Sequence, residues 1–126
     1  MSLVSLPSWG LTMDDLVMRA GLYYEKFTVT PYTGEVEGLE QGKFKNGIKD
    51  SEWIGYHKNG QLDYKGSFKN GRREGYWEFY YRNGELWMKG NFKDGYYVGN
   101  WVGFYEDGRL MESMTGKFKK GFKVSD

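Results

Sequence analysis

The feature that most constrains the fold is a repeat of 24 residues. Shifting the chain by this interval places Trp53 on Trp77 and Trp77 on Trp101. The same shift aligns three further sets: Gly60, Gly84 and Gly108; Leu62, Leu86 and Leu110; Phe44, Phe68 and Phe92. Repeats at a fixed interval are typical of proteins in which each unit buries its apolar face only against neighbouring units. The sequence therefore predicts a stacked array.

Each copy contains two turn signals. The first signal is an Asn-Gly or Asp-Gly pair between aromatic runs, which favours a type I′ turn with positive φ at both central residues. These pairs are Asn59-Gly60, Asn83-Gly84 and Asp107-Gly108. The second signal follows each phenylalanine: Lys45-Asn46-Gly47, Lys69-Asn70-Gly71, Lys93-Asp94-Gly95 and a displaced Lys119-Lys120-Gly121. Two turns per copy predict that each repeat is a hairpin of two strands.

The residues between the turns alternate as strands do. One face carries Leu62, Tyr64, Gly66 and Phe68, with Trp77, Phe79 and Tyr81 from the next run; the opposite face carries Tyr76, Tyr80, Trp87 and Phe104. We expect Gly66, Gly90 and Gly116 to leave room for a large ring from an adjoining strand. The pattern predicts an all-β, single-layer antiparallel meander of stacked hairpins of about 24 residues, with a short N-terminal cap.

The repeat also resembles a known family. Residues 66–86, GSFKNGRREGYWEFYYRNGEL, resemble the bacterial variant of the MORN repeat, in a family often labelled as antitoxin components. The preceding segments RAGLYY (residues 19–24) and PYTG (residues 31–34) resemble those that commonly precede such repeats, so the likeness covers about residues 16–123. The resemblance implies a scaffolding, membrane-associated or enzyme-appended setting, or the antitoxin role of the family label. The first copy departs from the pattern, with Ser51 in a glycine position and His57 in a tyrosine position.

These features divide the chain into four segments. We expect a leader at residues 1–15 that is partly disordered, a cap with a degenerate repeat at 16–42, MORN-like hairpin repeats at 43–123 and a tail at 124–126. Around residues 12–25 the sequence fits a short helix opened by Thr12, with Asp14 and Asp15 in its first turn, or a hairpin turning at Ala20-Gly21. We choose the hairpin.

Composition argues against most catalytic chemistry. The chain has 0 Cys and 1 His, which excludes a cysteine nucleophile and a clustered zinc site. His57 occupies an aromatic position, so we interpret it as a ring in a tyrosine slot. The glycine turns lack the Gly-Lys-Ser/Thr ending of a phosphate-binding loop. We predict no enzymatic activity, no cofactor and no metal.

The net charge of +1 argues against nucleic acid as a partner, although residues 1–42 carry a net charge of −4 and residues 43–126 one of +5. We predict a protein partner, or a second copy bound through the sheet face or edge; acidic lipid and glycan ligands stay open as alternatives. The expected contact residues are exposed aromatic rings and a ladder of basic residues: Tyr76, Tyr80, Trp87, Phe104, Lys45, Lys69, Arg72, Arg73, Lys93 and Lys119, reinforced by Lys120 and Lys123.

The favoured function is a non-enzymatic protein-interaction or scaffold module, antitoxin-like by family label. The alternative is binding of carbohydrate or another cell-envelope ligand through exposed aromatic residues. The sequence as written fits the cytoplasm, whereas a removed signal peptide would fit the cell envelope, so the compartment stays open.

Overall fold

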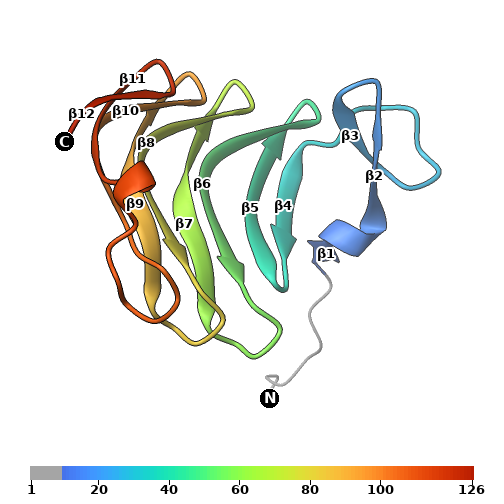
Figure 1. Cartoon of the computed structure of the whole chain (residues 1–126). Helices are drawn as coiled ribbons and strands as arrows, with labels where there is room; N and C mark the ends of the chain where they lie inside the picture. The colour runs from blue at the N-terminus through green and yellow to red at the C-terminus, as the bar shows by residue number, and fades with distance from the viewer. Residues whose placement is uncertain (1–9) are drawn as a thin grey trace.

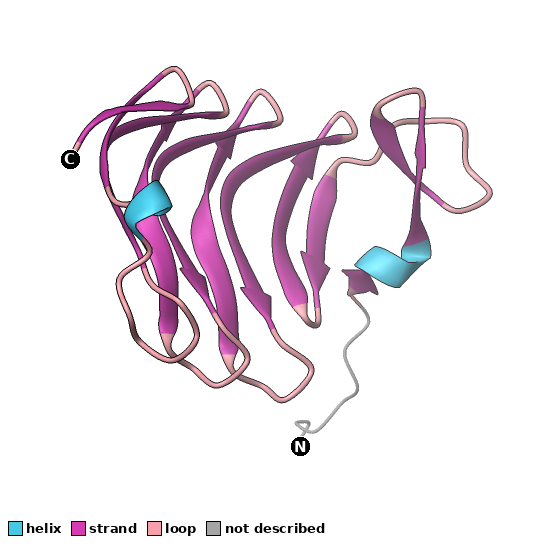
Figure 2. Cartoon of the chain, viewed as in Figure 1, coloured by secondary structure: helices cyan, strands magenta, loops and turns pink. Residues whose placement is uncertain are grey.

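The computed structural model describes residues 10–126 and has the predicted architecture. Ten strands form one sheet in the order β1-β4-β5-β6-β7-β8-β9-β10-β11-β12, and all neighbours are antiparallel except β1 and β4. The chain therefore crosses the sheet once, hairpin by hairpin (Figures 1 and 2). The strands of this sheet are β1 Leu11–Thr12, β4 Gly34–Glu37, β5 Glu40–Lys45, β6 Ile48–Tyr56, β7 Leu62–Lys69, β8 Arg72–Tyr80, β9 Leu86–Lys93, β10 Tyr96–Gly103, β11 Gly116–Lys119 and β12 Phe122–Ser125.

The two kinds of turn lie at opposite ends of the strands. The turns that follow the phenylalanines form the edge drawn uppermost in Figure 1, here called the upper edge. They are two-residue turns with positive φ at both positions, as at Asn46 (51°) and Gly47 (80°). This is the type I′ geometry, whose twist matches that of the flanking strands.

The turns at the lower edge differ from the prediction. In the turn after β6, only Gly60 has a positive φ (89°), and the Gly60 amide donates to the carbonyl of His57 at 2.9 Å. The Asn59 side chain accepts a hydrogen bond from the Gln61 amide at 3.0 Å instead of placing its own backbone at positive φ. These hairpins therefore have three-residue loops ending in a glycine, and the predicted type I′ turns at Asn59-Gly60, Asn83-Gly84 and Asp107-Gly108 are wrong in type but right in position.

The long strands bend, and the bend creates the core. Ser51, Gly75 and Gly99 have φ values of 63°, 75° and 70°, and the strand pairing shifts register beside each of them. Such a bulge bends its strand. Figure 1 shows β6 and β8 curving over towards the upper edge. One side of a single layer is thereby enclosed, since Trp53 and Trp77 are each only 1% exposed.

A continuous file of aromatic rings runs through the enclosed side. Phe44, Trp53, Phe68, Trp77, Phe92 and Trp101 follow one another with ring centroids 5.0–6.2 Å apart and interplanar angles of 76–88°. Edge-to-face contacts of this kind place the positive ring edge against the negative ring face. The file joins the successive hairpins, so each repeat is stabilised mainly by its neighbours.

Each buried indole lies over a glycine of the preceding strand. A Cβ atom at Gly66 would come closer than 3.0 Å to ring atoms of Trp77, and Gly90 has the same relation to Trp101. The indole N–H of Trp77 donates to the carbonyl of Ser67 at 3.0 Å, directly beside the bare glycine. The prediction that Gly66 and Gly90 make room for rings is confirmed.

The same prediction is wrong for Gly116. Its Cβ position would meet the Ser125 carbonyl and Lys123 of β12 instead of a ring. Trp101 is paired with Gly116 but leans the other way, over Gly90. The glycine under the first indole is Gly42, which lies beneath Trp53.

The N-terminal segment contains both structures that the sequence left open. Thr12 caps a 3-10 turn, η1 (Met13–Asp15), by accepting from the Asp14 amide. The chosen hairpin follows, with β2 (Leu16–Arg19) and β3 (Leu22–Glu25) turning at Ala20-Gly21 as a separate two-stranded sheet. The Tyr23 amide donates to the carbonyl of Gly47 at 2.9 Å, so the hairpin contacts the first upper turn.

The predicted segment boundaries remain predictions, and most of the leader (residues 1–9) lies outside the described residues. Its remaining residues contain β1 and η1, and β12 extends to Ser125 within the predicted tail. A second 3-10 turn, η2 (Glu112–Met114), precedes β11.

Candidate interaction surfaces

The basic residues of the ladder gather on the upper edge. The basic edge, as we call it, consists of Lys45, Lys69, Arg72, Lys93, Lys119 and Lys120, all exposed. Successive lysines lie in turns two strands apart, so their backbones are separated by about 10 Å. Among residues 10–126 these six side chains form no ion pair. The basic edge therefore presents six unpaired cations, in a row of turns that also contains the Asp94 carboxylate.

Backbone hydrogen bonds hold neighbouring upper turns together. The Gly95 amide donates to the carbonyl of Arg73 and the Gly121 amide donates to that of Tyr97, each at 2.9 Å. The backbones that carry the basic side chains are therefore held at a fixed spacing, which a ligand along this edge would meet.

Apolar side chains lie between the basic residues on this edge. Tyr96 is 55% exposed and Phe122 is 76% exposed. With Val98 they line a hollow of about 590 Å³ that also borders Lys93, Asp94 and Lys120. Exposed rings beside cations are typical of protein-binding surfaces.

Two predicted members of the ladder lie elsewhere. The Arg73 guanidinium is 5.4 Å from the ring centre of Trp77 and 5.5 Å from that of Phe92, so it covers the aromatic file instead of extending from the edge. Lys123 donates to the carbonyl of Glu112 and is paired with Asp126, each at 2.8 Å. Arg73 pairs in register with Phe68, so its side chain shares the face of the aromatic file, although the residue stays exposed.

Lys49 occupies the equivalent position one repeat earlier. Its ammonium lies 4.5 Å from the centre of the Trp53 ring and 3.7 Å from a carboxylate oxygen of Glu40. Burial lowers the pKa of Lys49, Glu40 opposes this shift, and the nearby Arg73 adds to it. The Tyr64 hydroxyl donates to Glu40 at 2.6 Å, and burial followed by this hydrogen bond raises the pKa of Tyr64 well above its ordinary value. Lys49 and Glu40 therefore compensate each other's charge within the fold.

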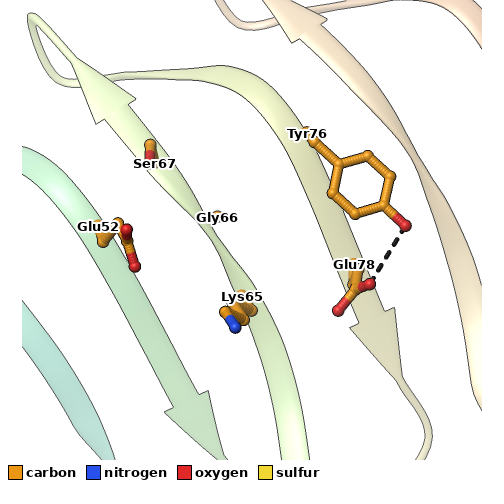
Figure 3. A pocket seen from close by; sticks show the side chains of 6 residues that line it. All are labelled: Glu52, Lys65, Gly66, Ser67, Tyr76 and Glu78. Atoms are coloured by element: carbon orange, nitrogen blue, oxygen red, sulfur yellow. Dashed lines mark hydrogen bonds between the residues drawn. The ribbon is translucent and has the colours of Figure 1, made fainter.

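The opposite face of the sheet, here called the outer face, carries a shallow hollow over Gly66. It measures about 290 Å³ and is bordered by Glu52, Lys65, Ser67, Tyr76 and Glu78 (Figure 3).

The predicted contact residues Tyr76 and Tyr80 share Glu78 as a partner, but only Tyr76 borders this hollow. Both hydroxyls donate to the Glu78 carboxylate, each at 3.1 Å. For each hydroxyl, burial and then the bond to Glu78 raise the pKa. Tyr76 is 50% exposed, but its polar end already has a partner.

Trp87 does not lie where simple alternation predicts. Its ring centroid is 6.0 Å from that of Phe79 and 5.8 Å from that of Tyr81, residues that the sequence pattern assigned to the other face. The β8–β9 pairing shifts register between Phe79 and Tyr80, which takes Trp87 out of the alternation.

Phe104 lies beside Trp87 at the lower edge. Its amide donates to the Trp87 carbonyl at 2.7 Å, and its side chain is half-buried. The structure thus separates the ten predicted contact residues into the upper edge, the outer face, the aromatic file and the lower edge.

His57 fills the tyrosine position as interpreted. Its Nε2–H donates to the carbonyl of Tyr80 at 2.9 Å, and one repeat later the Tyr81 hydroxyl donates to the carbonyl of Phe104 at 2.8 Å. In each case the partner lies 23 residues further along the chain.

Within residues 10–126, no three His, Asp or Glu side chains are grouped so as to hold a metal ion. That same part of the chain contains no helix with the length and apolar character needed to cross a membrane.

The fold and its surfaces define a β-hairpin repeat protein with a basic edge. The family model described as MORN repeat variant matches the chain twice, at residues 49–70 and 73–94. These matches cover the β6–β7 and β8–β9 hairpins, which confirms the predicted repeat. No curated protein matches the chain.

Proposed function

We propose that the chain is a non-enzymatic interaction module that binds an acidic polypeptide segment of a partner protein along its basic edge. The observation that carries this proposal is the set of six exposed cations on hydrogen-bonded turns, with no carboxylate paired to any of them among residues 10–126. Complementary charge steers association and fixes the register of a bound segment.

The apolar residues of the edge determine what else the partner carries. Ile48, Tyr96 and Phe122 are exposed in the same row of turns as the lysines. Burying these apolar side chains supplies binding affinity that exposed ion pairs alone do not provide. The partner segment therefore combines acidic residues with apolar ones. An antitoxin would be one case of such a module, with a toxin supplying the segment.

The test uses a labelled peptide of alternating glutamate and leucine. Binding is measured by fluorescence anisotropy for the wild-type chain, for Lys69→Gln/Lys93→Gln at the edge, and for Lys65→Gln/Lys89→Gln in β7 and β9 as the matched control. Both variants remove two positive charges. Since an exposed ion pair contributes about 0.2–1 kcal/mol, we expect the edge variant to weaken binding by about tenfold and the control by no more than about twofold.

Two results would count against the proposal. Equal weakening by both variants would mean that only net charge matters, and an affinity independent of salt would exclude recognition by the exposed cations. Once the edge is established, affinity capture from host extract with the same pair of variants identifies the natural partner. Size-exclusion chromatography of the isolated chain tests whether a second copy occupies the edge instead.

A further inference from the structure

A third hollow, of about 490 Å³, lies at the lower edge, at the opposite ends of the strands from the basic edge. Residues from three consecutive hairpins line it, including Asp63, Trp87 and Met111, which occupy equivalent positions 24 residues apart. Its volume lies within the range of small-molecule sites, about 300–1,000 Å³.

The floor of this hollow is a fixed aromatic platform. Trp87 is 36% exposed and its ring contacts Phe79 and Tyr81. The Tyr81 hydroxyl donates to the carbonyl of Phe104, and the Trp87 carbonyl accepts from the Phe104 amide. Because two neighbouring rings contact the indole, covering its exposed part would cost little side-chain entropy.

The rim of the hollow has charges of both signs. It carries Asp63, Arg82 and Glu106. Within the described part of the chain, neither Arg82 nor Glu106 forms an ion pair, and Asp63 is paired only with His57, at 3.4 Å. A small ion of either sign would therefore lie close to a like charge. A carboxylate accepts hydrogen bonds and a guanidinium donates them, so the rim matches a neutral ligand with many hydroxyl groups.

From this arrangement we propose that the hollow binds a saccharide. One face of a sugar ring consists of C–H groups and stacks on the Trp87 indole, while the hydroxyl groups at its edge bond to Asp63, Arg82 and Glu106. This site is independent of the proposed protein-binding edge: it uses other residues, and either site can fail while the other holds.

The test is isothermal titration of the full chain with neutral tetrasaccharides of glucose, mannose, galactose and N-acetylglucosamine. At least one of them should bind saturably. Trp87→Ala should weaken that binding by more than about tenfold, because the platform is lost. Arg82→Gln, which leaves the platform in place, should weaken it by about tenfold, because hydrogen bonds to a charged group are lost. Lys69→Gln, on the basic edge, should leave it unchanged.

Two outcomes overturn the proposal: no tetrasaccharide binds the wild-type chain, or a tetrasaccharide binds equally well to Trp87→Ala. If no sugar binds, tetramethylammonium is titrated next, and its binding at the hollow would replace the proposal with that of an aromatic cation site. Circular dichroism of each variant shows whether the sheet is intact.

Discussion

The packing of indole rings on bare glycine backbone can be tested by adding one methyl group. In Gly66→Ala the new Cβ would lie closer than 3.0 Å to ring atoms of Trp77, a separation that real Cβ atoms essentially never show. The ring cannot move freely, because Phe68 and Phe92 contact it edge-on and its N–H is bonded to Ser67. Overpacking of a filled core costs about 1–3 kcal/mol, and a lost hydrogen bond adds about 1 kcal/mol. We expect Gly66→Ala to lower the free energy of unfolding by about 3 kcal/mol.

Gly75→Ala provides the matched control. Gly75 has nothing within 4 Å of its Cβ position, so alanine there meets only the strain of a φ of 75°. That strain costs about 1–2 kcal/mol, and the reduced freedom of the unfolded chain recovers about 0.4–1 kcal/mol. The control should therefore lose about 1 kcal/mol. The difference between the variants measures contact with the indole separately from backbone strain.

Equilibrium urea unfolding, followed by both tryptophan fluorescence and circular dichroism, gives the free energies. Two probes are needed because repeat arrays can lose units separately. In a Trp77→Leu background the clash is removed, so Gly66→Ala should cost much less than in the wild-type chain. Equal losses for Gly66→Ala and Gly75→Ala, or an undiminished cost beside Leu at position 77, would refute the packing argument.

Three further predictions concern the first repeats. Ser51→Gly should stabilise the chain by about 0.5 kcal/mol in the same unfolding assay, because serine there has a φ of 63°; Ser51→Ala, which keeps the strain, should give no gain. His57→Tyr should leave the thermal midpoint nearly unchanged, whereas His57→Ala should lower stability by about 1 kcal/mol since the Tyr80 carbonyl loses its partner; equal effects would exclude the tyrosine-slot interpretation. The free energy of unfolding should fall as pH rises above the ordinary tyrosine pKa of 10.0, because the raised pKa of Tyr64 keeps its proton on the folded state while the unfolded chain releases it. In urea titrations at alkaline pH, Tyr64→Phe should reduce the fall in this free energy by up to about 1.4 kcal/mol per pH unit. An unchanged pH dependence would contradict the assignment to Tyr64.

Much of the architecture could be predicted because the repeat makes each local signal recur. The alternation placed Gly66 and Phe68 on one face with Trp77, and the turn residues located the hairpin ends from Asn46 onwards. The hairpin chosen for the N-terminal segment is confirmed, and the alternative that was set aside is present as well, as a short 3-10 turn. The capping pattern at Thr12 and the turn at Ala20-Gly21 are independent local signals, and both were correct.

The candidate surfaces were less predictable than the fold. Lys45, Lys69 and Lys93 share the upper edge because their turns recur in register, which the spacing implies. Trp87 departs from the predicted alternation because it lies at an irregularity in strand pairing, whereas Arg73 pairs in register with Phe68 and so shares the face of the aromatic file. One extra residue in a pair of strands reverses the face that simple alternation assigns.

The sequence by itself determined the length of the repeat, the positions of the hairpins and the pairing of large rings with glycines. These properties depend on neighbours along the chain or one strand away, so a periodic sequence specifies them. Only the tertiary structure decided which side of the sheet is enclosed, how far the strands bend at Ser51, Gly75 and Gly99, and which cations remain unpaired. The bend brings residues from several repeats close together. Their contacts depend on the twist and bend added up over successive strands, which the 24-residue spacing does not specify.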